Sequence, residues 1–146
     1  MGAMTNTPPP QVWPSLSARD PRALIDFLVD TVGFTETVAY TAHTDGTDGT
    51  DAVVHAELAW PAGGGVMLGQ ARPGNDGCVT GPGSFSAYVV VPDPADVDAL
   101  AKRVRAAGGE IARDVHDADH GSHDVAIRDP EGNTWHFGTY HGHPVG

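Results

Sequence analysis

Cysteine, long apolar runs and basic residues are all scarce in this 146-residue sequence. Because Cys78 is the single cysteine, no disulfide can form within the chain, which favours a reducing, cytoplasmic setting. No run approaches the roughly 18 apolar residues of a membrane span, so no membrane partner is expected. The 8 basic residues form no run that could follow a phosphate backbone, so no nucleic acid partner is expected either.

The acidic balance is the strongest feature of the composition, with a formal net charge of −11. Such a surface favours cationic ligands, although simple solubility is the plainer explanation. Residues 1–10 are predicted to be an expression remnant followed by a disordered Pro-rich arm. Residues 11–146 then have the length of one ordinary domain.

The chain repeats one pattern, marked by Asp20-Pro21 and Asp93-Pro94, which lie 73 residues apart. In each pair the aspartate suits the N-cap of a helix and the proline suits its first turn. Apolar residues then recur at three- and four-residue spacing until a glycine ends the pattern. The predicted helices cover residues 21–32 and 94–107.

Strand-like segments follow each predicted helix, three in each half of the chain. In one of them the face formed by Val54, Ala56, Leu58 and Trp60 alternates with His55 and Glu57. The segment 130–133, Pro-Glu-Gly-Asn, is predicted to be the turn of the last hairpin. The fold class is therefore predicted to be α+β, with two βαβββ modules. Module one covers about 11–70, a Gly- and Pro-rich linker covers 71–83, and module two covers about 84–140; residues 43–51 are predicted to be a flexible hairpin tip.

Three motifs support a family resemblance: "HAEL" at 55–58, "GGGVMLG" at 63–69 and "GSHDVAIRDPEGNTWHFGTY" at 121–140. With the paired Asp-Pro helix starts, they resemble the vicinal oxygen chelate superfamily. This superfamily includes glyoxalase I, bleomycin-resistance proteins, fosfomycin-resistance enzymes and extradiol dioxygenases. The resemblance implies curled mixed sheets around a cavity, a homodimer and, in the enzymes, a divalent metal.

The positions that correspond to the family's metal ligands hold Trp13, Met67 or Leu68, Ser86 and His136. An indole does not coordinate a metal at neutral pH, and a serine hydroxyl is a weak ligand beside imidazole or carboxylate. Only His136 is a good ligand, whereas a stable site needs about three. We therefore predict neither a metal nor another cofactor.

His136 is the residue whose role decides most about the chemistry. It alternates with Trp135 and Phe137, which are expected to pack on the helix side, so His136 should face the cavity. Three roles stay open: a structural histidine with a hydrogen-bond partner, a group that contacts a ligand or handles a proton, and a metal ligand.

The remaining candidates suggest binding more than catalysis. Aromatic walls suit a planar or cationic guest, and the plainer alternative for these aromatic residues is core packing. His55 and Glu57 could form a polar pair in the cavity, and the plainer alternative for them is the solvent-exposed side of a half-buried strand. The histidines of segments 116–124 and 141–143 are too loosely spaced to define a metal site. The predicted ligand-binding residues are Trp13, His55, Glu57, Trp60, Met67, Ser86, Tyr88 and His136.

The function predicted first is metal-independent binding of a small molecule by a glyoxalase/bleomycin-resistance-like homodimer, with drug sequestration as one role. The alternative is a metal-dependent lyase, isomerase or dioxygenase that combines His136 with His55, Glu57 or a C-terminal histidine. A third hypothesis is a metal-free enzyme with His136 as general base. The identity of the guest stays open.

Overall fold

The computed structural model describes residues 9–43, 51–72 and 80–145. The expectations for residues 1–8, for Cys78, for most of the linker and for residues 44–50 of the hairpin tip therefore lie outside the described residues.

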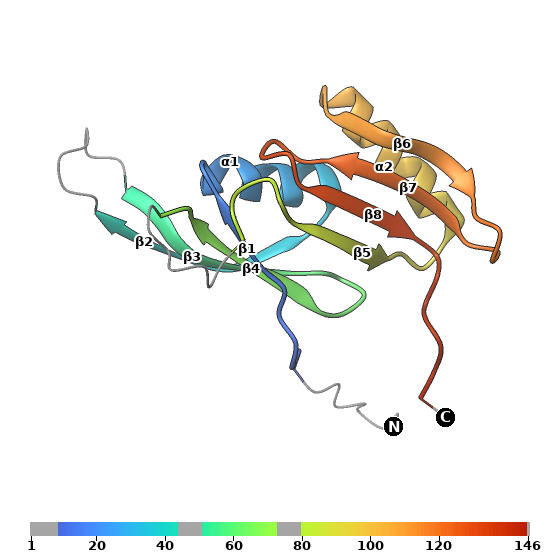
Figure 1. The fold of residues 1–146 in the computed structure, drawn as a ribbon, viewed down its shortest axis with the longest axis horizontal. Helices are drawn as coiled ribbons and strands as arrows, with labels where there is room; N and C mark the ends of the chain where they lie inside the picture. The colour runs from blue at the N-terminus through green and yellow to red at the C-terminus, as the bar shows by residue number, and fades with distance from the viewer. Residues whose placement is uncertain (1–8, 44–50, 73–79, 146) are drawn as a thin grey trace, which may run out of the picture.

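Two four-stranded sheets carry the fold and lie side by side (Figure 1). The first sheet has the strand order β1-β4-β3-β2 and the second has β5-β8-β7-β6, so the second repeats the connectivity of the first. In each sheet the first strand pairs in parallel with the last, and the other pairs are antiparallel. The two predicted modules are confirmed. The strands are β1 (Ser15–Ala18), β2 (Thr35–His43), β3 (Asp51–Ala59), β4 (Gly65–Gln70), β5 (Ser86–Val90), β6 (Glu110–Asp117), β7 (His123–Arg128) and β8 (Thr134–Gly138).

Both helices begin where the Asp-Pro pairs predict. Asp20 accepts a hydrogen bond from the Ala23 N–H at 3.1 Å, and Asp93 accepts one from the Ala95 N–H at 3.0 Å. The first helix departs from the expectation because it changes to π-helical geometry, and the Gly33 N–H reaches back to the Leu28 carbonyl at 2.9 Å. The helical segments are α1 (Pro21–Asp26), η1 (Phe27–Val32) and α2 (Pro94–Ala106).

The core is continuous across the two modules. Trp135 and Phe137 of β8 are fully buried, and Phe34 joins them from the first module. The ring of Phe34 lies 5.7 Å from that of Trp135, edge to face. His136 lies between the two buried aromatics in sequence and is exposed. The alternation predicted for this strand is therefore confirmed.

The predicted alternation of β3 is wrong at one position. Val53 is 4% exposed, whereas Val54 is only partly buried. Tyr40 pairs with His55 and the next residue of β2, Thr41, pairs with Val53, so Val54 forms a bulge. A bulge adds one residue to one strand and reverses the inward and outward pattern beyond it.

The turn between β7 and β8 connects the modules. The Glu131 carboxylate accepts hydrogen bonds from the N–H groups of Arg19 and Asp20, at 2.8 Å and 2.9 Å. Asp129 organises the same turn by accepting from the Asn133 amide and the Trp135 indole. The second module is thereby anchored at the start of the first helix.

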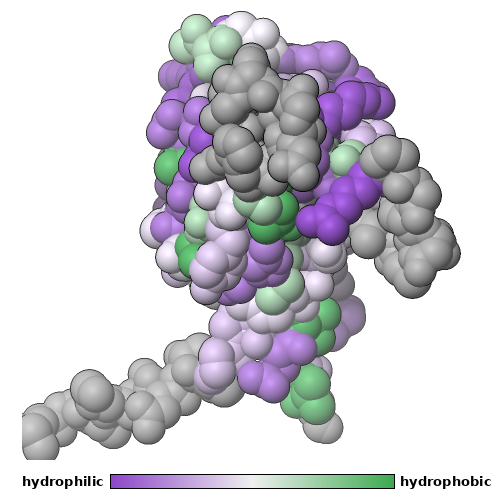
Figure 2. Space-filling view, turned by 90° about the vertical axis from the view of Figure 1, so that its left-hand side faces the viewer, coloured by the Kyte–Doolittle hydropathy of each residue, from purple (hydrophilic) through white to green (hydrophobic). Residues whose placement is uncertain are grey.

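In the described part of the chain, no helix combines the length and apolar character needed to cross a membrane. The coloured surface in Figure 2 is mostly hydrophilic, with hydrophobic residues in small groups. This distribution is consistent with the net charge of −11.

Candidate functional site

A pocket of about 490 Å³ opens between the two modules, and we call it the junction pocket. Its volume lies within the roughly 300–1,000 Å³ that is usual for small-molecule sites. Tyr88 and His141 are the ionisable side chains among its described lining residues. The other lining residues are apolar or glycine; those that form its walls are Phe34, Trp60, Val66, Ala87, Val89 and Trp135.

Hydrogen bonds fix the aromatic walls in place. The Trp60 indole N–H donates to the Val90 carbonyl at 2.8 Å, and the Trp135 indole N–H donates to Asp129 at 2.8 Å. The ring of Phe34 lies 4.9 Å from that of Trp60. Trp135 is fully buried and Phe34 is 4% exposed, so these two rings support Trp60 from the core. Because the Trp60 indole donor is satisfied inside the protein, its partly exposed ring offers a guest apolar surface in a preformed geometry.

Tyr88 stands at the rim of the pocket in a hydrogen-bonded network. Its hydroxyl donates to Asp124 Oδ1 at 2.8 Å and accepts from the Tyr140 N–H at 3.1 Å, while Ser122 donates to Asp124 Oδ2 at 3.0 Å. Burial raises the pKa of the Tyr88 phenol and the Asp124 carboxylate adds to the shift, although the Tyr140 N–H opposes it. Tyr88 is therefore a neutral, oriented ring at pH 7.

Gly138 makes the contact between Tyr88 and Asp124 possible. A Cβ at this position would lie 1.8 Å from Asp124 Oδ1 and 2.2 Å from the Tyr88 hydroxyl. The hydrogen bond therefore occupies the space above a glycine, and no larger residue fits under it.

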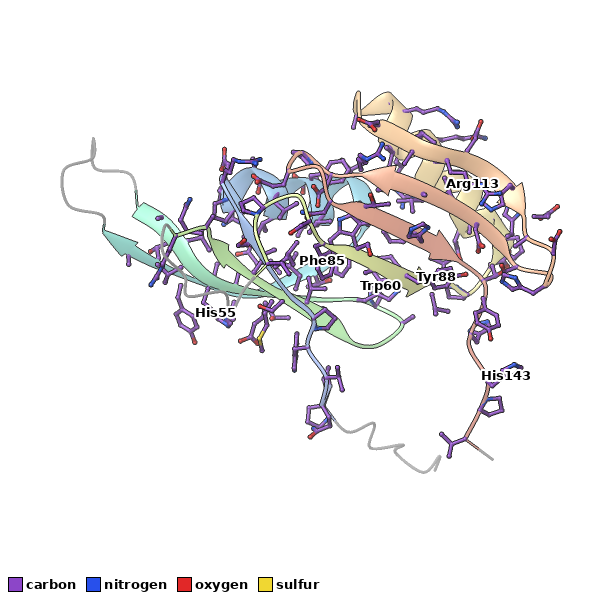
Figure 3. The ribbon with its side chains drawn as sticks, viewed as in Figure 1. His55, Trp60, Phe85, Tyr88, Arg113 and His143 are labelled. Carbon is purple, nitrogen blue, oxygen red and sulfur yellow. The ribbon has the colours of Figure 1, made fainter. Side chains whose placement is uncertain are left out.

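The first sheet has an open face, here called the module-one face, formed by Tyr40, His55, Glu57 and Met67. His55 Nε2 lies 2.9 Å from the Glu57 carboxylate, and the Tyr40 ring stacks on His55 at a centroid distance of 6.2 Å. His55 and Met67 also line a second hollow, of about 370 Å³. Figure 3 shows His55 well away from Trp60 and Tyr88.

The second sheet has a corresponding open face, here called the module-two face, with Ser86, Tyr88 and His136. Tyr88 lies beside His136 in the pairing of β5 with β8, and Ser86 lies beside Thr134. Tyr88 is 42% exposed. Both Ser86 and His136 are exposed, and neither lines the junction pocket.

Trp13 lies before β1 and belongs to none of these groups. Its indole N–H donates to the Pro10 carbonyl at 3.2 Å. Its ring covers Gly65, since a Cβ there would lie 2.8 Å from it. Trp13 therefore packs next to a residue that lines the junction pocket, and it does not line the pocket itself.

The structure divides the eight predicted ligand-binding residues among these places. Trp60 and Tyr88 come together at the junction pocket, and Trp13 packs beside it. The other five, His55, Glu57, Met67, Ser86 and His136, lie on the two open faces. Their binding roles stay predictions. Sequence reasoning missed Phe34, Ala87 and Val90, because their place at the pocket depends on how the two modules pack.

The candidate metal positions are dispersed among the described residues, where no three His, Cys, Asp or Glu side chains are close enough together to hold an ion. In the His-rich segment, His116 bonds to the Asp114 carbonyl and His120 to Ser122. His123 lies between two carboxylates, with its Nε2 2.9 Å from Asp98 and its Nδ1 2.6 Å from Asp117. Because the carboxylates bond to different nitrogens of the ring, the three groups do not converge on one point. The nearest partners of these histidines are thus protein groups, not one another.

The sequence profile described as Glyoxalase/Bleomycin resistance protein/Dioxygenase superfamily matches residues 11–137. No curated protein matches the chain. Among solved structures, TioX from Micromonospora sp. ML1 is similar at 28% sequence identity and a TM-score of 0.64, covering 86% of this chain and 94% of its own.

Two further solved structures share the fold. Lactoylglutathione lyase from Agrobacterium tumefaciens has 23% identity and a TM-score of 0.62, and covers 91% of this chain and 96% of its own. TnmS3, an antibiotic binding protein from Streptomyces sp. CB03234, has 22% identity and a TM-score of 0.63, and covers 94% of this chain and 98% of its own.

Proposed function

The chain belongs to the Glyoxalase/Bleomycin resistance protein/Dioxygenase superfamily, and we propose that it binds a small organic molecule in the junction pocket without a metal. The observation that carries this proposal is the pocket itself: about 490 Å³, walled by aromatic rings that are already held in place. A preformed apolar pocket binds without ordering its own walls, which lowers the conformational cost of association.

The donor set supports a metal-independent role. Metal-dependent members need His, Glu or Gln ligands that converge, and His136 has Tyr88 and Ala126 as its neighbours in the sheet. His55 and Glu57 form a two-residue pair, one ligand short of a stable site. Metal analysis after tag-free purification tests this point directly, since one tightly held ion per chain would favour the enzyme alternative.

Drug sequestration is the biological role that we favour. One relative of the same fold is an antibiotic binding protein, and a pocket with fixed aromatic walls holds its guest without having to transform it. Expression of the protein in a drug-sensitive bacterium, followed by growth on a panel of aromatic antibiotics, tests the role. Protection that disappears when the pocket is blocked would support it.

A homodimer in the cytoplasm is the assembly that we propose for this function. The two open faces expose aromatic and polar side chains, with Tyr40 58% exposed and Tyr88 42% exposed. In a dimer, the module-one face of one chain can cover the module-two face of the other, giving two composite cavities. Sedimentation equilibrium of the wild type and of Tyr40→Glu tests this arrangement, because a charge at the interface should shift the equilibrium towards monomer.

A thermal-shift screen identifies the guest class and tests the proposed function. A ligand at a hundred times its Kd adds about 2.7 kcal/mol of stability, which raises the Tm by roughly 5–11 °C in a chain of this size. Ala62 is exposed on the turn that lines the pocket, so Ala62→Trp should block entry. Ala99→Trp, on the exposed side of α2, is the matched control. Hits that stabilise both variants alike would show that the pocket is not the site.

A further inference from the structure

The junction pocket contacts the main chain of β5 as well as side chains. Four consecutive residues of this strand, Ala87, Tyr88, Val89 and Val90, line it. Side chains of neighbouring residues in a strand point to opposite faces of the sheet. A single pocket lined by four residues in a row must therefore lie along the edge of the strand, where the N–H and C=O groups emerge. Figure 3 shows Trp60 and Tyr88 together at this edge.

The pairing of β5 with β8 determines which main-chain groups face the pocket. The Thr134 N–H donates to the Phe85 carbonyl at 3.1 Å, and the Val91 N–H donates to the Gly138 carbonyl at 2.8 Å. In a parallel ladder, the N–H and C=O of every second residue of a strand point to the same neighbouring strand. The main-chain groups of the odd-numbered residues of β5 therefore point to β8. The main-chain groups of Tyr88 then point away from β8, because β5 is an edge strand.

Trp60 occupies one end of this edge and leaves Tyr88 available. The indole N–H bonds to the Val90 carbonyl at 2.8 Å. Outside the β5–β8 ladder, which Tyr88 faces away from, no hydrogen bond between described residues uses the Tyr88 N–H or the Tyr88 C=O. A donor and an acceptor of the same residue therefore lie side by side at the apolar pocket.

This arrangement restricts the guest. A purely apolar molecule that covered the edge would leave the two Tyr88 groups buried without partners, which costs about 1–3 kcal/mol for each group. A guest with its own N–H and C=O at strand spacing pairs with both, as an added strand does at a sheet edge. Its ring would lie against the aromatic walls of the pocket.

From the β5 edge and the aromatic walls together, we infer that the junction pocket takes a neutral, aryl-capped, peptide-like amide, whose N–H and C=O pair with the main chain of Tyr88. The inference rests on the proposed function and specifies its ligand class. The guest should be neutral, because no Asp, Glu, Lys or Arg is among the described lining residues that could pair with a charge on it. An unpaired charge is costly in an apolar pocket.

Two synthetic probes of the same shape test the inference. The first is N-(2-naphthoyl)glycine N-methylamide, which carries the glycine N–H and C=O next to an aryl group. The second is the corresponding ester, in which an oxygen replaces that N–H. Isothermal titration calorimetry should show the amide binding about tenfold more tightly, which is the size of one lost neutral hydrogen bond. In ¹⁵N–¹H spectra the amide probe should also shift the Tyr88 N–H resonance and slow its hydrogen exchange.

Pocket variants separate the failure of this inference from the failure of the proposed function. Ala62→Trp should abolish binding of both probes, and Ala99→Trp should leave it unchanged. If the amide and the ester bind equally and Ala62→Trp blocks both, the pocket stands and the pairing with Tyr88 is wrong. Binding that Ala62→Trp does not affect would overturn the pocket as well. Failure of the amide probe to bind at millimolar concentration would also overturn the inference.

Discussion

Replacing Gly138 with alanine tests the polar network at the rim of the pocket. The new Cβ would lie 1.8 Å from Asp124 Oδ1 and 2.2 Å from the Tyr88 hydroxyl, so the hydrogen bond of 2.8 Å between them cannot persist. Both atoms are at the ends of side chains, and Tyr88 is 42% exposed. The side chains can therefore rotate away, and the backbone need not move.

The expected cost follows from what that rotation breaks. A hydrogen bond to a charged group contributes about 1.5–3 kcal/mol, and partial exposure places this one at the lower end. We expect a loss of about 1–2 kcal/mol, which lowers the Tm by roughly 2–8 °C. Gly81→Ala is the matched control, because a Cβ at Gly81 meets no atom within 4 Å.

The assay has two readouts, and they must agree. Calorimetry should show a lower Tm for Gly138→Ala than for Gly81→Ala. Phenol absorbance against pH should show the pKa of Tyr88 moving back from its raised value towards the ordinary one, since the ring leaves Asp124 and its partly buried position. If the two variants melt alike and the Tyr88 pKa does not move, Gly138 does not support this network.

Three further predictions concern the strand β8, a histidine bridge and metals. Trp135→Ala should cost roughly 3–5 kcal/mol in chemical denaturation, because the fully buried indole leaves a cavity and Asp129 Oδ2 loses one of its two side-chain donors, with Asn133 remaining. His136→Ala should change stability by less than about 1 kcal/mol, because His136 is exposed. Equal losses in the two variants would contradict the burial pattern. The His123 imidazolium donates hydrogen bonds to Asp98 and Asp117, which raise its pKa in that order of size. The bridge therefore stabilises the fold fully below the ordinary histidine pKa and loses that contribution as pH rises through the raised value. A stability profile between pH 5 and 9 should therefore be flatter in His123→Gln than in the wild type, and unchanged curvature would count against the bridge. Treatment with EDTA should leave the Tm and ligand binding unaltered, and a large drop in either would favour the metal-dependent alternative.

Local sequence signals were sufficient for much of the fold. The Asp-Pro pairs place both helix starts, because capping and the fixed φ of proline act within one turn. The alternation of Trp135, His136 and Phe137 gives the correct buried face of β8, because side chains in a strand have a period of two. The bulge at Val54 is not encoded in that period, since it depends on how β2 and β3 pair.

The candidate site was less accessible to such reasoning. Trp60 and Tyr88 were identified as aromatic residues that could bind, but the indole N–H of Trp60 bonds to Val90 in the other module. No local pattern specifies a contact that depends on the packing of two modules. Phe34 and Ala87 were missed for the same reason, because each belongs to a regular strand or loop pattern and lines the pocket only after the modules meet.

The central claim is that this protein binds a small molecule in the junction pocket without a metal. A crystal structure of the protein with the best hit from the thermal-shift screen, from crystals grown in the presence of EDTA, tests this claim most directly. Our account predicts electron density for the ligand between Trp60 and β5, with no ion within coordination distance. Density for the ligand on the module-one or module-two face instead, or a ligand held by a metal at His136, would contradict it.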